Sequence, residues 1–289
     1  MTTVGQWIEG ARPRTLPAAI SPVLVGTGAA AAADGARPGR AVLALVVALA
    51  LQVAVNYAND YSDGVRGTDA DRVGPLRLVG SGVSTPAAVK RAALAAFAVA
   101  AVAGLALAAL TTWWLLAIGA VAMLAAWFYT GGARPYGYRA LGEISVFVFF
   151  GLVATLGTTY VQLERVTAAA VGGGIACGAL ACAILVVNNL RDIPTDTVAA
   201  KRTLAVVLGD RRTRLLYGVL VAVAFVVVVV LAPALPWVLL ALAVAPLAVR
   251  PVRIVAAGRV GRELVPVLRD TGRLQLAYAV LLAIGLALS

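Results

Sequence analysis

The chain contains, from Thr167 to Leu190, the run TAAAVGGGIACGALACAILVVNNL. No charged residue interrupts this run, and its length covers the roughly 20 residues that cross the hydrocarbon core of a bilayer as an α-helix. Its two cysteines, Cys177 and Cys182, do not share a helix face, so we expect packing residues and neither a disulfide nor a metal site. The run predicts a membrane-spanning helix.

Similar runs recur along the whole chain, which has 289 residues, 62% of them hydrophobic and 13% charged. A single water-soluble core does not hide so much apolar surface, and the short alternating segments of a membrane barrel are absent from the sequence. We predict an all-α integral membrane protein, with residues 1–289 forming one domain and nine transmembrane helices. The predicted spans are 16–33, 41–58, 88–110, 113–130, 141–161, 167–190, 215–231, 236–249 and 274–288.

The basic residues divide unevenly between the two sides of these nine spans. All but three of the 24 lysines and arginines fall on the side of the N-terminus, the exceptions being Arg37, Arg40 and Arg165. Loops rich in Lys and Arg stay in the cytoplasm, so we predict a multi-pass protein of the cell membrane with its N-terminus cytoplasmic and its C-terminus outside. An alternative for the first apolar run is a secretory signal, although prolines interrupt it.

The net charge of +11 is therefore mainly a signal of topology. Basic residues scattered over short loops argue against a nucleic-acid partner. They suit contact with anionic membrane lipid or with an anionic substrate.

Two polar motifs end predicted spans on the same side of the membrane. They are NYAND at Asn56 to Asp60 and NNLRD at Asn188 to Asp192. Both have the spacing N-x-x-x-D, which places an amide and a carboxylate one helical turn apart on one face. The repetition suggests a pseudo-repeat of helical units whose two motifs face each other.

Each motif is followed by a further acidic residue, Asp63 in the first and Asp196 in the second. Pro194 predicts that the second helix ends or kinks before Asp196, whose carboxylate would then approach from a loop. Carboxylates at the ends of membrane spans are costly unless they are paired or bind a metal. The alternative is that these carboxylates have only a structural role, in which they cap helix ends or form salt bridges in loops.

The donor types indicate a hard cation. Carboxylates with amide carbonyls, in a chain that has no histidine, suit Mg²⁺ better than zinc or copper. Mg²⁺ is commonly shared between a few carboxylates and substrate phosphates, and Arg77, Arg134 and Lys201 are candidate partners for the remaining phosphate charge. Because hydrocarbon-rich spans surround this metal-diphosphate site, the sequence predicts a lipid-tailed substrate whose diphosphate leaves.

Departure of the diphosphate would leave an allylic cation, which aromatic faces and the exclusion of water stabilise. Near span ends, aromatic residues also serve as interfacial anchors. The candidates are Tyr57, Tyr61, Trp127, Phe128, Tyr129, Phe147, Phe149, Phe150 and Tyr160. For Glu143 two roles fit, namely contact with an acceptor substrate and a favourable charge at a helix N-terminus.

These motifs resemble those of the UbiA superfamily of intramembrane prenyltransferases, and within it the menaquinone-pathway branch that acts on 1,4-dihydroxy-2-naphthoate. The first motif departs from the second in having Gly64 four residues after Asp60, although Asp63 is usual in that branch. The matching segments are RPRTLP at 12–17, NYANDYSD at 56–63, GTD at 67–69, GPLR at 74–77, SG at 81–82, YTGGARPYGY at 129–138, LGE at 141–143, 147–151, NNLRD at 188–192, TD at 195–196 and KRTL at 201–204.

The resemblance implies nine helices around a central cavity and Mg²⁺ ions bridging the Asp motifs and a polyprenyl diphosphate. It also implies prenylation of 1,4-dihydroxy-2-naphthoate with loss of CO₂, giving demethylmenaquinone. The implied catalytic residues are Asp60, Asp63, Asp192 and Asp196, and the implied metal ligands are these four with Asn56 and Asn188. The expected diphosphate-binding residues are Arg77, Arg134 and Lys201, and the expected acceptor-binding residues are Glu143, Tyr129 and Tyr160.

Three rival functions are open at this point. A sister prenyltransferase would act on 4-hydroxybenzoate, homogentisate or a chlorophyll precursor, but the segments at 129–138 and 143–151 favour the naphthoate branch. A cation-coupled transporter would bind its ion with intramembrane carboxylates. It would need polar residues near the midplane of the bilayer, and the predicted spans have few of them. A purely structural membrane protein would tolerate loss of Asp60 or Asp192.

Overall fold

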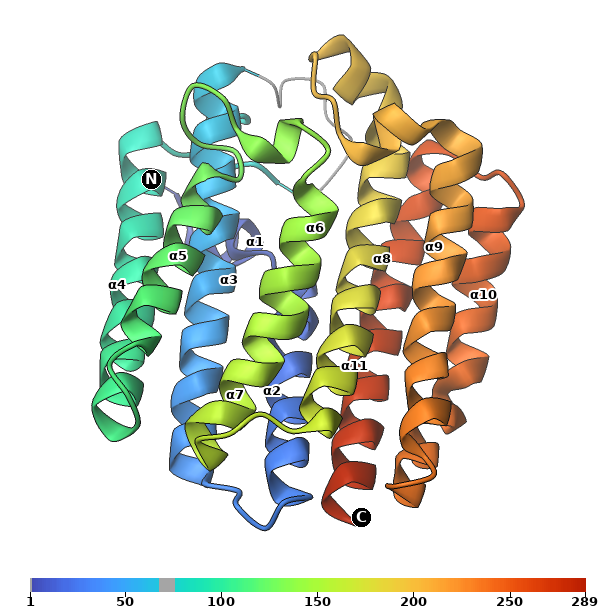
Figure 1. Ribbon diagram of the computed structural model, residues 1–289. Coiled ribbons are helices and arrows are strands. Elements are labelled where there is room, and N and C mark those ends of the chain that lie inside the picture. Colours follow the sequence, from blue (N-terminus) through green and yellow to red (C-terminus); the bar gives the residue numbers. More distant parts are fainter. Residues whose placement is uncertain (1, 68–75) are drawn as a thin grey trace.

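The computed structural model describes residues 2–67 and 76–289 (Figure 1). Parts of two predicted motifs, Thr68-Asp69 and Gly74-Pro75, lie outside the described residues. The described part is helical and contains no β-strand. Its elements are α1 (Val4–Ala11), η1 (Pro13–Thr15), α2 (Leu16–Ala31), α3 (Pro38–Arg66), α4 (Pro86–Leu110), α5 (Leu115–Phe128), η2 (Tyr136–Tyr138), α6 (Gly142–Val146), the π-helical η3 (Phe147–Val153), α7 (Ala154–Leu163), α8 (Ala168–Val198), α9 (Leu204–Leu231), η4 (Pro236–Val244), α10 (Ala245–Ala256), η5 (Gly261–Leu264) and α11 (Val265–Ala287).

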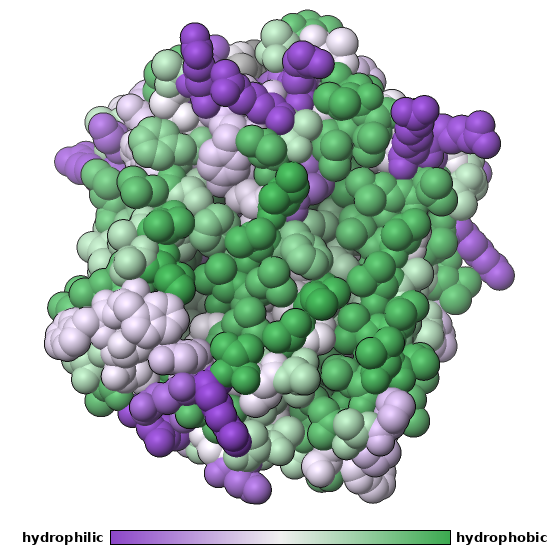
Figure 2. Space-filling model, in the orientation of Figure 1, coloured by the Kyte–Doolittle hydropathy of each residue, from purple (hydrophilic) through white to green (hydrophobic). Residues whose placement is uncertain are grey.

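The predicted class, an all-helical multi-pass membrane protein, is confirmed. Figure 2 shows an apolar band across the middle of the molecule with hydrophilic side chains towards its two ends. Six helices in the described residues are long and apolar enough to cross a membrane. They are Pro38–Arg66, Pro86–Leu110, Gly142–Leu163, Ala168–Val198, Leu204–Leu231 and Pro236–Ala256.

The predicted count of nine spans is not confirmed by this criterion. The predicted spans 16–33, 113–130 and 274–288 correspond to α2, α5 and α11. The first two helices have only 16 and 14 residues, fewer than the roughly 20 that a perpendicular span needs. The third, α11, carries Arg269, Asp270 and Arg273 in its first turns, which lower its mean hydropathy.

Two helices extend well past the predicted ends of their spans. Helix α3 reaches Arg66 and helix α8 reaches Val198, so both acidic motifs lie within helices. The prediction that Asp196 approaches from a loop is wrong, because α8 continues through Pro194. The hydroxyls of Thr195 and Thr197 donate to the carbonyls of Asp192 and Ile193, at 3.0 and 2.7 Å, and these bonds support the last turn where proline removes a donor.

Helix α2 lies in the middle of the bundle, in contact with α3, α7, α8 and α11. Helices α4 and α5 pack beside α3, whereas α9 packs beside α8 (Figure 1). The close contacts depend on small residues. A Cβ atom on Gly26 of α2 would lie 2.6 Å from the carbonyl oxygen of Thr155, and one on Gly151 of η3 would lie 2.5 Å from the Cα atom of Gly178 in α8.

Replacing Gly151 by alanine is therefore expected to destabilise the protein by about 1–3 kcal/mol, because the new methyl group would force backbone movement. Gly218 of α9 is the matched control, since a Cβ atom there meets nothing within 4 Å and alanine improves helix propensity. Thermal unfolding of the detergent-solubilised protein measures both changes. Equal midpoints for Gly151→Ala and Gly218→Ala would contradict the packing argument.

Candidate functional site

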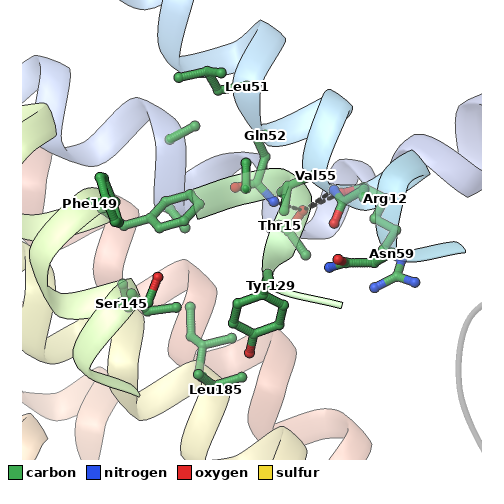
Figure 3. Close-up of a pocket in the computed structure, with 18 of the residues that line it drawn as sticks. Arg12, Thr15, Leu51, Gln52, Val55, Asn59, Tyr129, Ser145, Phe149 and Leu185 are labelled. Carbon is green, nitrogen blue, oxygen red and sulfur yellow. Dashed lines mark hydrogen bonds between the residues drawn. The ribbon is translucent and has the colours of Figure 1, made fainter. Parts of the chain in front are cut away.

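A cavity of about 1760 Å³ runs through the helical bundle. It exceeds the roughly 300–1,000 Å³ of ordinary ligand pockets. At the end where α3 and α8 terminate, its lining is polar and charged, and towards the other end it becomes apolar. In Figure 3, Arg12 and Asn59 lie on one side of the pocket, and Phe149 and Ser145 lie on the opposite side.

Asp63 is the centre of one polar cluster at this end. Its side chain is only 4% exposed, and its Oδ2 atom lies 3.6 Å from Nη2 of Arg77 and 3.7 Å from Nζ of Lys201. The Tyr138 hydroxyl donates to Oδ1, and Lys201 Nζ lies 4.8 Å from the centre of the Tyr138 ring. Two cations therefore lie beside one carboxylate at the polar end of the cavity, and both are of the kind that binds phosphate oxygens.

Asp192 is the centre of a second cluster, carried by α8. Arg191 donates from Nε and Nη2 to the two carboxylate oxygens, each at 2.6 Å, and from Nη2 to Oδ1 of Asn188 at 2.9 Å. One turn further on, Asp196 accepts a 3.5 Å hydrogen bond from the Thr203 hydroxyl. All five residues line the cavity, so the whole second motif lies at its polar end.

The first motif reaches the cavity in a different register. Asn59 and Asp63 line the cavity, whereas Asp60 does not. Asn59 and Asp63 have the same N-x-x-x-D spacing as the predicted pair, Asn56 and Asp60. The sequence therefore contains the same pattern a second time, three residues further along the chain. Asn59 is thus a site residue that the sequence reasoning missed. Its Oδ1 atom accepts a 2.7 Å hydrogen bond from the hydroxyl of Thr130.

Asp60 holds the backbone that follows the first motif. Its oxygens accept hydrogen bonds from the N–H groups of Leu78 and Val79, at 2.7 and 3.0 Å, and the residue is 1% exposed. These bonds fix the segment that carries Arg77. Asp60 therefore positions a cation in this structure and does not face the cavity with its carboxylate.

Asn56 lines the cavity but holds the N-terminal segment. Its amide nitrogen donates to the carbonyl of Ala11 and to Oγ1 of Thr15, at 2.9 and 3.0 Å. Gln52, one turn earlier on α3, donates to the same hydroxyl oxygen at 2.8 Å (Figure 3). The Thr15 hydroxyl therefore joins the start of α2 to the wall of the site.

Of the three predicted diphosphate-binding cations, Arg77 and Lys201 line the cavity. Arg134 is exposed on the loop before η2 and does not line it. The cavity is also lined by four arginines for which the sequence analysis predicted no diphosphate-binding role. They are Arg12, Arg14, Arg262 and Arg269.

The three predicted acceptor-binding residues occupy different places. Tyr129 lines the cavity. Glu143 lies behind the wall, 7% exposed, and its Oε1 atom accepts a 2.9 Å hydrogen bond from the amide of Asn189, which does line the cavity. Tyr160 is far along α7, where its ring packs edge-on against Trp114 with the ring centres 5.0 Å apart. The structure does not bring Tyr160 to the polar end.

Comparison with known proteins assigns the chain to a family. A model described as the UbiA prenyltransferase family matches residues 19–263. The chain belongs to this family. The expected resemblance is thereby confirmed, and it covers most of the chain.

Several bacterial relatives share one name. The 1,4-dihydroxy-2-naphthoate octaprenyltransferase of Mycobacterium tuberculosis (strain ATCC 25618 / H37Rv) is 57% identical over 287 residues, covering 99% of this chain and 98% of that protein. The protein of the same name from Escherichia coli (strain K12) is 40% identical, covering 98% of this chain and 95% of that protein. A UbiA homologue from Archaeoglobus fulgidus bound to GPP and Mg²⁺ has the same fold, with a TM-score of 0.68, 14% identity, and coverage of 98% of this chain and 100% of that chain.

The oxygen donors of this UbiA family member fit Mg²⁺. Within the described residues, no group of three or more His, Cys, Asp or Glu side chains could hold a metal ion by itself. Mg²⁺ needs no such cage, because it keeps several waters and takes one or two carboxylates together with substrate phosphates. Asn59 and Asp63 on α3, with Asp192 and Asp196 on α8, offer such a partial set of ligands at one end of the cavity.

Tyr138→Phe is expected to lower kcat/KM for prenyl transfer by about tenfold. The substitution removes one hydrogen bond to a charged carboxylate, and such a bond contributes about 1.5–3 kcal/mol. It keeps the ring beneath Lys201. Tyr136→Phe is the control, because that hydroxyl donates to the carbonyl of Ala125 and contacts Ser145 and has no hydrogen bond to Asp63. Initial rates at varied donor concentration test the difference, and equal kinetics for the two variants would contradict it.

Proposed function

We propose that the chain is a Mg²⁺-dependent 1,4-dihydroxy-2-naphthoate polyprenyltransferase of menaquinone biosynthesis. It transfers a polyprenyl group from polyprenyl diphosphate to the naphthoate ring, with loss of diphosphate and CO₂, and gives demethylmenaquinone in its reduced, hydroquinone form. The observation that carries this proposal is the charged end of the large cavity, where Asp63, Arg77, Lys201 and Asp192 all line the wall at the head of an apolar chamber. The relatives' shared name supports the choice of acceptor.

The two acidic clusters hold the magnesium diphosphate in this proposal. Asn59 and Asp63 serve from α3, and Asn188, Asp192 and Asp196 serve from α8. When bound, magnesium would neutralise the negative charge that builds on the departing diphosphate. Arg77 and Lys201 bind the phosphate oxygens directly. The metal roles of Asn56 and Asp60 stay predictions, since both hold neighbouring backbone in this structure.

The chemistry divides between the polar end and the apolar chamber. The bond between the first prenyl carbon and the diphosphate oxygen breaks, and the oxygen keeps the electron pair. The ring carbon that bears the carboxylate then bonds to the prenyl carbon, and CO₂ leaves its electron pair to the ring. Tyr129, Phe149 and Phe150, which line the cavity, offer aromatic faces to the allylic cation, while the surrounding apolar wall excludes water.

The whole chain acts as one transmembrane domain in the cell membrane in this proposal, with the polar end of the cavity cytoplasmic and the C-terminus outside. The distribution of Lys and Arg supports this orientation. The predicted outer side carries only Arg37, Arg40 and Arg165 of the 24 basic residues. A cytoplasmic polar end gives both anionic substrates access without crossing the bilayer.

The test uses purified, detergent-solubilised protein with Mg²⁺, 1,4-dihydroxy-2-naphthoate and a labelled polyprenyl diphosphate. Mass spectrometry follows the prenylated quinone and CO₂. We expect turnover that stops on addition of EDTA and returns with Mg²⁺. Turnover of 4-hydroxybenzoate but not of naphthoate would assign the protein to a sister activity, and folded protein that turns over no acceptor would overturn the proposal.

A further inference from the structure

The cavity extends far beyond the charged end. Along α3 its lining runs from Asp63 back to Ala44, about 28 Å at the helical rise per residue. Its far end is a floor of buried apolar side chains, Val23, Ala44, Leu107 and Val161. Beneath this floor Arg40 donates to the carbonyl of Val161 at 2.8 Å. A long apolar ligand can therefore lie along the bundle.

Three glycines line this cavity from three different helices: Gly104 of α4, Gly119 of α5 and Gly157 of α7. Gly104 and Gly119 lie towards the ends of α4 and α5 that are remote from Asp63, and Gly157 lies one helical turn before the floor residue Val161 on α7 (Figure 1). A Cβ atom added to any of the three would meet nothing within 4 Å. They thus surround open space in the far part of the cavity.

At these three glycines an added Cβ atom would not touch another helix. Gly26 and Gly151 allow helices to touch, since a Cβ atom there would lie within 3 Å of another helix. A glycine inside a helix destabilises it relative to alanine. At Gly104, Gly119 and Gly157, glycine lowers the stability of the helix but leaves a larger cavity than alanine would.

We propose that Gly104, Gly119 and Gly157 determine how long a prenyl chain the protein accepts, by leaving the far part of the cavity open for the terminal isoprene units. The inference rests on the proposed function, because it assigns the cavity to the tail of the polyprenyl diphosphate. The diphosphate end of every donor occupies the same charged site. Donors of different length therefore differ only in how far their tails reach towards the floor.

The test replaces each glycine singly by leucine and measures kcat/KM for geranyl, geranylgeranyl and octaprenyl diphosphate with one acceptor. A leucine side chain fills space that only the longer tails need. We expect kcat/KM for octaprenyl diphosphate to fall about tenfold or more, as for other overpacked sites, while geranyl diphosphate keeps its rate. The preferred donor then shifts to a shorter chain.

Gly218→Leu is the matched control. Gly218 lies inside α9, a Cβ atom there also meets nothing within 4 Å, and the residue does not line the cavity. It reports the effect of leucine for glycine in a membrane helix without any change in the cavity. We expect all donors to keep their relative rates in this variant.

Geranyl diphosphate turnover is the internal test of folding. A leucine variant that turns over no donor is replaced by the alanine variant at the same position, which adds one methyl group to open space and gives a smaller shift of the same sign. Equal changes for all three donors at all three positions would overturn the inference. If the unaltered protein turned over none of these donors, the proposed function itself would fail.

Discussion

Asp63→Asn is expected to lower kcat/KM for prenyl transfer by about 10²–10³-fold, the usual loss when one preorganised electrostatic group is removed from a site. The substitution keeps the shape of the side chain but removes its charge. Arg77 and Lys201, both within 4 Å of the carboxylate, would then lack their shared anion. A ligand for Mg²⁺ would also be weakened, because the carboxylate becomes an amide.

Asp34→Asn is the control for this experiment. Asp34 is exposed on the loop between α2 and α3, at the end of the bundle remote from Asp63, and has a φ of 56°. Asparagine adopts that backbone conformation readily. Rates measured over a range of Mg²⁺ concentrations distinguish the two variants. We expect Asp34→Asn to match the unaltered protein, and an equally active Asp63→Asn would remove this carboxylate from the proposed site.

The helical membrane class follows from composition, but the helix ends do not. Hydropathy marks where the apolar stretch stops, and the hydrogen bonds of a helix continue past that point into the aqueous boundary. The predicted spans therefore ended at residues 58 and 190, whereas α3 and α8 continue to Arg66 and Val198. The extra turns carry Asp63, Asp192 and Asp196, so the acidic clusters are held on rigid helices.

The register of the first motif illustrates a limit of spacing arguments. The spacing N-x-x-x-D fits both Asn56 with Asp60 and Asn59 with Asp63, and a shift of three residues rotates a side chain by only about 60° from the original face. Both pairs thus point in similar directions along α3. The contact of Asp60 with the backbone of Leu78 decides between them, and it joins segments that no local pattern connects.

Tyr160 is a different kind of error, because the sequence held the information to avoid it. Tyr160 and Glu143 belong to the same predicted span, and 17 residues of helix separate them by about 26 Å. Two residues so far apart cannot both contact one small aromatic acceptor. Arg134 could not be excluded in this way, since only the path of the loop places it outside the cavity.

Lys201→Met is expected to lower kcat/KM for the polyprenyl diphosphate by about 10²-fold. Lys201 is 8% exposed, and its backbone is fixed from two sides. Its N–H group donates to the carbonyl of Asp196 at 2.8 Å, and the N–H group of Arg202 donates to the carbonyl of Tyr138 at 3.1 Å. A cation held in this way loses little entropy on binding phosphate, so it stabilises the leaving diphosphate strongly.

Arg202→Met is the control, because Arg202 is adjacent in sequence and exposed. Its loss removes the same charge from the protein without changing the cavity. Steady-state kinetics with varied donor separate two contributions of Lys201. Loss of binding that is equal in the ground and transition states raises KM alone, whereas loss of the charge that neutralises the leaving diphosphate lowers kcat. We expect both changes in Lys201→Met, and kinetics like those of Arg202→Met would show that the diphosphate binds elsewhere in the cavity.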